Sequence, residues 1–172
     1  MRTFGLSVLL LLAACPAPAP APGPRSATTV VAPKALPDLT LARLDDGAAA
    51  TLSSELGGRP ALINLWATWC EACVAEFGAL GRLAARTQGS GVVLAIAVGE
   101  KRETVADFVR RHGLAYARLV DEEFRLGDTL GKERVPTTLV VDRAGRIVFT
   151  GGALDAAALD AYRRVLGVSS EP

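Results

Sequence analysis

The chain has 172 residues, of which 50% are hydrophobic, and its formal net charge at pH 7 is +1. This length suits one ordinary domain plus a tail, and the hydrophobic fraction is large enough for a proper core. The near-neutral charge gives no sign of a nucleic-acid or strongly acidic partner, and three cysteines with a single histidine limit any metal site.

The N-terminus has the pattern of an export signal. Arg2 gives a positive start, residues 4–12 are apolar, and two alanines then precede Cys15. The apolar stretch is shorter than the roughly 20 residues that a membrane-spanning helix needs, and it fits a secretory signal peptide. Its Leu-Ala-Ala-Cys ending resembles a bacterial lipobox, in which the cysteine becomes the lipidated N-terminus. The alternative is an ordinary signal peptide cleaved at an Ala-x-Ala site such as residues 17–19.

Alanine and proline alternate through residues 16–24. Such a segment cannot form helix or ladder hydrogen bonds and tends to polyproline II, which makes a semi-rigid spacer. We therefore predict a signal peptide at 1–14, a tether at 15–35 that holds the protein off a membrane, a folded domain at 36–168, and a tail at 169–172.

The predicted domain alternates strands and helices. Turn signals and apolar runs predict an N-terminal hairpin with its turn at 45–47, and strands at 61–66, 92–98, 114–120, 138–141 and 147–150. Helical spacing and end signals predict helices at 53–56, 71–86, 101–112, 122–130 and 154–166. This order predicts a parallel α/β core with an antiparallel hairpin at its end.

Two cysteines, Cys70 and Cys73, lie where the strand at 61–66 is followed by a helix. At a helix start they lie one turn apart on one face. The helix N-terminus favours a thiolate and can lower the pKa of a cysteine from about 8.5 by one to several units. The spacing predicts that Cys70 is the exposed attacking thiolate and that Cys73 resolves the mixed disulfide, which leaves a Cys70–Cys73 disulfide.

Other uses of this pair fit less well. A structural disulfide across so small a loop would stabilise little. Zinc needs four ligands, but the chain has no second Cys-x-x-Cys, and His112 is near the end of a different helix. A c-type haem site needs a histidine where Val74 stands. Redox exchange that needs no cofactor beyond the disulfide is favoured, with a copper or zinc carrier as the alternative.

The stretch at 64–73, Asn-Leu-Trp-Ala-Thr-Trp-Cys-Glu-Ala-Cys, resembles the active-site stretch of thioredoxin-fold proteins. It is most similar to the extracytoplasmic TlpA/ResA/DsbE-like branch, where Trp-Ala-Thr-Trp-Cys is typical. The resemblance extends to about Gly167 and includes the closing hairpin, with its turn at 142–145. It implies an α/β thioredoxin fold, in which helices flank a central mixed β-sheet, with an N-terminal β-hairpin extension.

The resemblance also assigns a second wall to the site. Residues 135–138, Val-Pro-Thr-Thr, resemble the loop of this family that bears a cis-proline opposite the cysteines. It implies that Pro136 is cis and that Val135 presents its backbone to an incoming peptide, as in β-augmentation. We expect Trp69 to form a flat surface beside the sulfur of Cys70.

A proton acceptor is the remaining requirement. Cytoplasmic thioredoxins resemble this chain but have a buried aspartate where Asn64 stands, and asparagine takes no proton at neutral pH. The resemblance to ResA-like proteins implies that Glu76 lies near the cysteines and manages their protons. Burial would raise its pKa towards neutrality, as a proton shuttle requires. The alternative is an ordinary acid near a helix start, favoured by the helix dipole.

These features predict a thiol–disulfide oxidoreductase on the periplasmic side of a bacterial membrane, held there by a lipid on Cys15. By resemblance it would reduce protein disulfides, for example in cytochrome c maturation or copper-site assembly. A membrane electron donor of the DsbD/CcdA type would restore the dithiol. A disulfide-donating oxidant uses the same chemistry and is the remaining alternative.

Overall fold

The computed structural model describes residues 34–168. The predicted signal peptide, the lipidation site Cys15, the Ala/Pro tether up to residue 33 and the tail at 169–172 lie outside the described residues. None of the helices in the described range combines the length and the apolar character that crossing a membrane requires.

Within this range eight strands form one mixed sheet, in the order β1-β8-β7-β4-β5-β6-β2-β3. The strands are β1 (Lys34–Ala35), β2 (Thr40–Arg43), β3 (Ala49–Thr51), β4 (Ala61–Trp66), β5 (Val92–Val98), β6 (Ala117–Asp121), β7 (Thr137–Val141) and β8 (Arg146–Gly151). The helices are α1 (Leu52–Leu56), α2 (Glu71–Thr87), α3 (Arg102–His112), α4 (Arg125–Leu130) and α5 (Ala156–Leu166).

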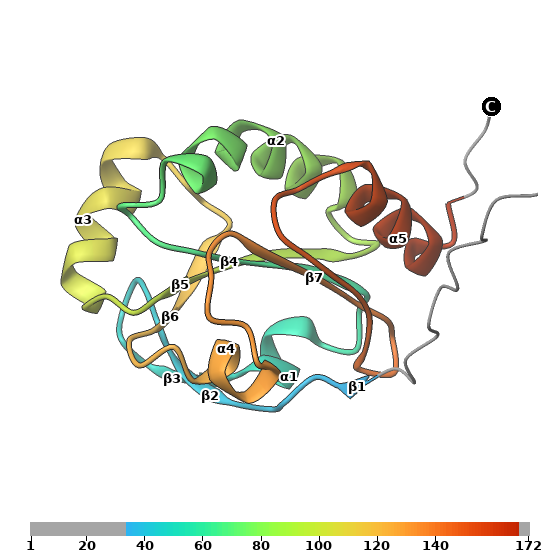
Figure 1. Cartoon of the computed structure of the whole chain (residues 1–172), viewed down its shortest axis with the longest axis horizontal. Coiled ribbons are helices and arrows are strands. Elements are labelled where there is room, and N and C mark those ends of the chain that lie inside the picture. The colour runs from blue at the N-terminus through green and yellow to red at the C-terminus, as the bar shows by residue number, and fades with distance from the viewer. Residues whose placement is uncertain (1–33, 169–172) are drawn as a thin grey trace, which may run out of the picture. The chain divides into compact units, whose positions relative to one another are not determined.

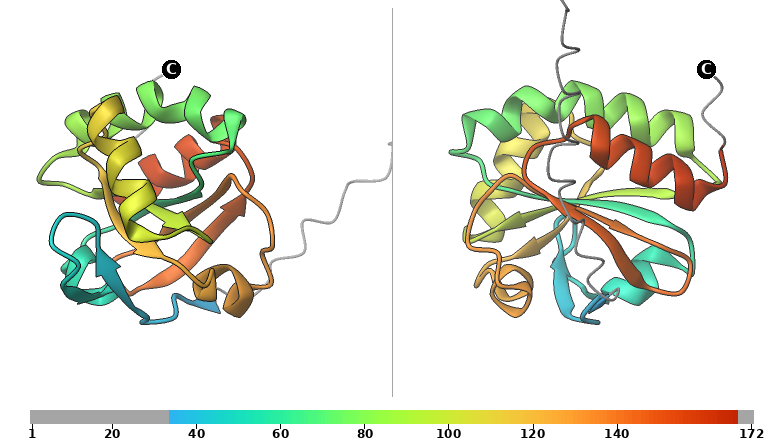
Figure 2. Two further views of the ribbon diagram at one scale, coloured as in Figure 1. Left: turned by 90° about the vertical axis from the view of Figure 1, so that its left-hand side faces the viewer. Right: turned by 45° about the vertical axis from the view of Figure 1, so that its right-hand side comes forward.

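Helices cover both faces of the sheet. Figure 1 shows α2, α3 and α5 on one face and the shorter α1 and α4 on the other, and the views in Figure 2 agree. The central strand β4 is buried along its whole length. Its alternate residues point to opposite faces: Leu62 and Trp66 pack under the first layer of helices, and Ile63 and Leu65 pack under the second. This accounts for the continuous apolar run, because a strand covered on both faces needs no polar side.

The direction of the strands fixes the location of the site. β4 runs parallel to β5, β5 runs parallel to β6, and the hairpin of β7 and β8 closes the other side antiparallel to β4. The prediction of a parallel core with an antiparallel closing hairpin is confirmed. The N-terminal hairpin of β2 and β3 joins the sheet through β6. The carboxyl ends of β4 and β5 therefore meet at one edge, directly before the two cysteines.

Two predicted boundaries differ from the structure by three residues, and the other differences are of one or two residues. The strand expected from residue 114 begins at Ala117, because Gly113 ends α3 in the left-handed conformation and the N–H of Ala117 closes a turn onto Leu114 O. The helix expected from residue 122 begins at Arg125, because Phe124 has φ of 55° and ends a turn from Asp121. The strand β1 was not predicted, and it brings the sheet two residues ahead of the expected start at residue 36.

Candidate active site

The first cysteine caps the helix that carries the second. After β4 ends at Trp66, the chain makes a turn in which the N–H of Cys70 donates to Ala67 O at 3.1 Å. Cys70 has extended dihedral angles as the N-cap of α2, and its Sγ accepts the N–H of Cys73 at 3.2 Å. Sulfur takes the place that a hydroxyl or carboxylate oxygen has in most N-caps. A thiolate at Cys70 would face the positive end of the helix.

Cys70 and Cys73 are joined as a disulfide, with their sulfur atoms 2.12 Å apart. The exposed fraction is 6% for Cys70 and 0% for Cys73. Cys70 is therefore the more accessible sulfur, although it is far less exposed than the sequence pattern suggested. The neighbouring Trp69 is 69% exposed, so a large apolar surface lies beside the sulfur that a client would approach. Its role in client binding remains a prediction.

The loop before β7 forms the second wall. The peptide bond between Val135 and Pro136 is cis, as the resemblance implied. Thr137, the next residue, pairs with Leu65 of β4, which places Pro136 level with the end of the strand that leads to the cysteines. Val135 packs against both apolar layers. The structure thus brings Pro136 and the disulfide to the same edge, while the docking of a client on Val135 stays a prediction.

Glu76 lies one turn beyond Cys73 on α2, on the same face of the helix. Its Oε1 accepts the N–H of Leu154 at 2.6 Å, and its Oε2 lies 3.5 Å from Nδ2 of Asn64. The side chain is half-buried. Burial raises the pKa of Glu76, and the hydrogen bonds from Leu154 and Asn64 offset part of that rise. Through its contact with Asn64, this carboxyl group lies against β4, the strand that leads to the two cysteines.

Sequence reasoning missed Glu100, which holds the turn that carries Cys70. Its half-buried carboxylate accepts two hydrogen bonds from Thr68: the N–H donates to Oε2 at 2.7 Å, and the hydroxyl donates to Oε1. The sequence does place Glu100 near the site: it follows β5 by two residues, and the carboxyl ends of neighbouring parallel strands lie at the same edge of the sheet. Hydrogen bonds to an ionised acceptor are stronger than neutral ones, so Glu100 fixes the position of this turn.

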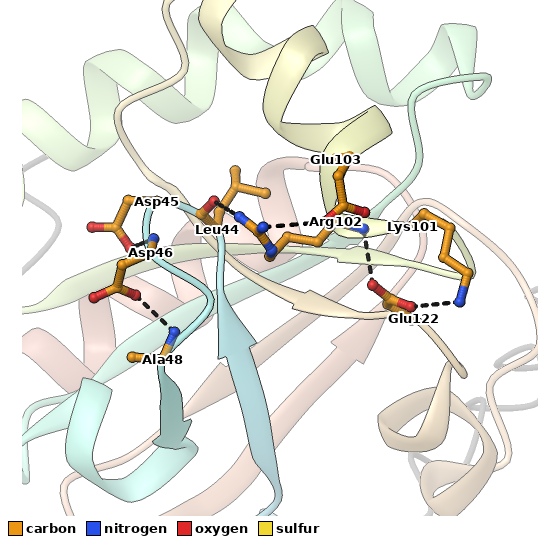
Figure 3. A network of polar contacts seen from close by, with 8 residues as sticks. All are labelled: Leu44, Asp45, Asp46, Ala48, Lys101, Arg102, Glu103 and Glu122. Carbon is orange, nitrogen blue, oxygen red and sulfur yellow. Dashed lines mark hydrogen bonds and ion pairs between the residues drawn. The ribbon is translucent and has the colours of Figure 1, made fainter.

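The segment that carries Glu100 is itself anchored to the end of β6. The N–H of Gly99 donates to Asp121 O at 3.0 Å. Glu122 accepts the N–H of Arg102 at one oxygen and the ammonium group of Lys101 at the other, both at 2.9 Å. Figure 3 shows the two contacts of Glu122 and the Arg102 guanidinium, which donates to Leu44 O in the adjacent hairpin. The segment that positions Glu100 against Thr68 is therefore itself held in place by hydrogen bonds.

Replacing Glu100 by alanine should loosen the turn before Cys70. Two hydrogen bonds to a charged group are lost, each worth about 1.5–3 kcal/mol when buried, and the partial exposure of Glu100 lowers that value. The free energy of unfolding should therefore fall by about 2 kcal/mol. Disulfide exchange should also slow. Glu103→Ala is the matched control, since Glu103 is exposed on α3 and its one ion pair, with Arg102, lies at the surface, where such pairs contribute little; neither property should change measurably. Chemical denaturation and exchange rates measure both effects, and equal behaviour of the two variants would contradict the role of Glu100.

The described residues contain no group of three or more His, Cys, Asp or Glu side chains that could hold a metal ion. A copper or zinc carrier built on Cys70 and Cys73 would need further ligands. In the part of the chain that the structure describes, the two cysteines have no such partners. The arrangement at the start of α2 suits a disulfide that opens and closes.

Residues 32–157 match the Redoxin family. The chain belongs to the Redoxin family. A thiol–disulfide oxidoreductase ResA from Geobacillus thermodenitrificans is 32% identical over 147 residues, which cover 84% of this chain and 83% of that relative. This Redoxin-family protein is a thiol–disulfide oxidoreductase, and Cys70 and Cys73 are its cysteine pair at disulfide distance.

Solved structures agree with the fold. The crystal structure of an exposed lipoprotein thioredoxin, Etrx1 of Streptococcus pneumoniae, has a TM-score of 0.63 and 25% identity, and it covers 76% of this chain and 98% of that one. A secreted thiol-disulfide isomerase from Corynebacterium glutamicum has a TM-score of 0.65 and 27% identity, with 77% and 85% covered. The prediction of a thioredoxin fold for this Redoxin-family protein is confirmed.

Proposed function

We propose that this protein reduces disulfides in extracytoplasmic proteins. The observation that carries the proposal is the charge around Cys70. Glu71 directly follows it, Glu76 lies less than two turns further along α2, and the first cationic residue of that helix is Arg82. Negative charge near a thiolate raises its energy. These acids offset part of the stabilisation that the helix N-terminus gives the thiolate. A dithiol with a less stabilised thiolate gives up its electrons more readily, whereas a strong oxidant such as DsbA has a stabilised reduced form.

The reaction would proceed in two exchanges. In the dithiol form, the Cys70 thiolate attacks a client disulfide, forms a mixed disulfide and releases one client thiolate. Glu76 then accepts the proton of the Cys73 thiol. The Cys73 thiolate attacks Sγ of Cys70 and expels the second client sulfur as a thiolate. The client gains two electrons, the Cys70–Cys73 disulfide forms, and solvent protons neutralise the client thiolates.

The client would approach along the edge where the cysteines and Pro136 meet. Trp69 offers it an exposed aromatic surface, and the backbone at Val135 would pair with an extended client segment, as in β-augmentation. Candidate clients are apocytochrome c and copper-site proteins. A membrane dithiol donor of the DsbD/CcdA type would return the enzyme to its reduced form.

The location is part of the same proposal. The apolar N-terminus ending in Leu-Ala-Ala-Cys15 supports export and lipidation, and the similar Etrx1 is an exposed lipoprotein. A lipid anchor holds through buried CH₂ groups worth roughly 0.8 kcal/mol each, so stable attachment takes more than one acyl chain. The residues up to 33 would then connect the domain to the periplasmic face of the membrane.

The reduction potential tests the direction of electron flow. Equilibration with a graded glutathione or dithiothreitol buffer should give a potential near or below about −270 mV, the value of thioredoxin. Glu71→Lys should raise it, because an ammonium group would stabilise the Cys70 thiolate. Arg82→Lys, which keeps its charge, should leave it unchanged. A wild-type value near about −120 mV would instead identify an oxidant that donates disulfides.

A further inference from the structure

Asn64 on β4 is fully buried, and its two polar atoms have different surroundings. Nδ2 lies 3.5 Å from Oε2 of Glu76 and 3.5 Å from Oγ1 of Thr138. The other atom, Oδ1, is buried with no hydrogen-bond partner within residues 34–168. Since nearly all buried acceptors are paired in native proteins, an unpaired Oδ1 beside a titratable carboxyl group needs an explanation.

The two oxygens of Glu76 differ as proton sites. Oε1 accepts the backbone N–H of Leu154 at 2.6 Å, and Figure 1 shows the connection between β8 and α5 passing beside α2. A backbone N–H can only donate, and the unprotonated oxygen of a carboxylic acid is its better acceptor. A proton taken up by Glu76 therefore favours Oε2, the oxygen that faces Asn64.

We propose that the side-chain amide of Asn64 turns over when Glu76 gains or loses a proton, so that Asn64 is a positioning residue for both states of the carboxyl group. With Glu76 ionised, Nδ2 donates to Oε2, which is the orientation in the structure. With Glu76 protonated, Oδ1 faces Oε2 and accepts its O–H. This inference rests on the proposed function of Glu76 in proton transfer.

The surroundings of the amide permit both orientations. The contacts of Nδ2 at 3.5 Å are longer than the usual N–H···O distance of about 2.7–3.2 Å, so turning over breaks no strong bond. The Thr138 hydroxyl can donate as well as accept, and it can therefore pair with either end of the amide. An amide has donor and acceptor ends of nearly equal size, a property that neither aspartate nor leucine offers at this position.

Few groups set the proton affinity of Glu76. From β4 it faces Asn64, from the segment before α5 it faces the N–H of Leu154, and on α2 it lies one turn from Cys73. The three influences on its pKa are burial, the Leu154 N–H and the Asn64 amide. None of these is a charged side chain, so a change in the Asn64 signals can be assigned to Glu76 itself.

NMR of the full oxidised chain tests the proposal without a folding risk. The carboxyl carbon of Glu76 and the side-chain NH₂ group of Asn64 are followed as the pH is lowered. The NH₂ shifts should move with the midpoint of the Glu76 carbon. Nuclear Overhauser contacts from the NH₂ protons to Hγ of Glu76 should weaken below that midpoint. In Glu76→Gln the NH₂ signals should stay constant over the same range.

The outcomes separate this inference from the proposed function. If Glu76 titrates above the usual glutamate range while the Asn64 signals stay constant, the turnover is contradicted and the proton-transfer role of Glu76 stands. If Glu76 titrates like an exposed glutamate, both fail. If the Asn64 signals titrate equally in wild type and Glu76→Gln, another group controls the amide and the turnover is again contradicted.

Discussion

A chain carrying Cys70→Ser should lose all thiol–disulfide exchange. Cys70 is the only cysteine of the pair with exposed surface, and Cys73 is completely enclosed, so Cys73 cannot take over the first attack. A serine hydroxyl is not ionised at neutral pH and cannot replace the thiolate. The reduction of a small-molecule disulfide by the pre-reduced protein measures the effect. Exchange at the native rate in this variant would overturn the assignment of Cys70.

The companion variant Cys73→Ala should fail at the second step instead. Cys70 can still attack, but the neighbouring thiol that resolves the mixed disulfide is gone, so the protein should remain bonded to its client. Non-reducing electrophoresis and mass spectrometry of the trapped species would identify that client. Cys15→Ser is the matched control, since it changes a cysteine that precedes the described domain; it should exchange at the native rate. Trapping in the control but not in Cys73→Ala would contradict the order of attack.

The elements around the disulfide were predictable because local signals agree there. A strand buried on both faces leaves an uninterrupted apolar run, and the two cysteines one turn apart mark the helix that follows. The structure accordingly has β4 at Ala61–Trp66 and α2 beginning at Glu71. Boundaries failed where a single residue overrides the pattern. Because Phe124 has φ of 55°, α4 starts only at Arg125, and a phenylalanine gives no sequence signal for that backbone conformation.

Contacts between distant segments were not predictable in the same way. A two-residue strand such as β1 carries no pattern of its own, and only its pairing with β8 defines it. The N–H of Leu154 donates to Glu76 across a separation of 78 residues, and no local sequence pattern predicts a hydrogen bond over that distance. Glu100 could have been found, because the ends of parallel strands converge, but an acid after a strand is also common on any surface.

The site therefore has two carboxylates with different roles, Glu100 and Glu76. Glu100 accepts hydrogen bonds from the turn that carries Cys70, and its own segment is fixed to the end of β6. Glu76 is held by one backbone N–H and one weakly placed amide, and burial raises its pKa. A carboxyl group whose pKa is raised by burial takes up a proton more readily than an ordinary glutamate does. The resolving step of disulfide exchange requires such a proton acceptor.

Glu76→Gln should slow the resolution of the mixed disulfide near neutral pH. Without a proton acceptor beside Cys73, its thiol must ionise unaided, and loss of a general base costs about a hundredfold or more. The defect should shrink as the pH passes the ordinary cysteine pKa of about 8.5, because Cys73 then ionises without help. Stopped-flow exchange against pH measures it. Glu103→Gln, a change at an exposed acid on α3, should leave the profile unaltered.

The same variant should be more stable than the wild type at neutral pH. Because burial raises the pKa of Glu76, the folded protein binds this proton more tightly than the unfolded chain does. The free energy of unfolding of the wild type therefore falls as the pH rises from the ordinary glutamate pKa through the raised one. Glutamine has no charge to bury, so the variant lacks this fall, and the two proteins should converge in acid. Denaturant unfolding of the oxidised forms across pH measures the difference. A gap that widens in acid would mean that Glu76 is stabilised as a carboxylate, which would contradict its role as a proton acceptor.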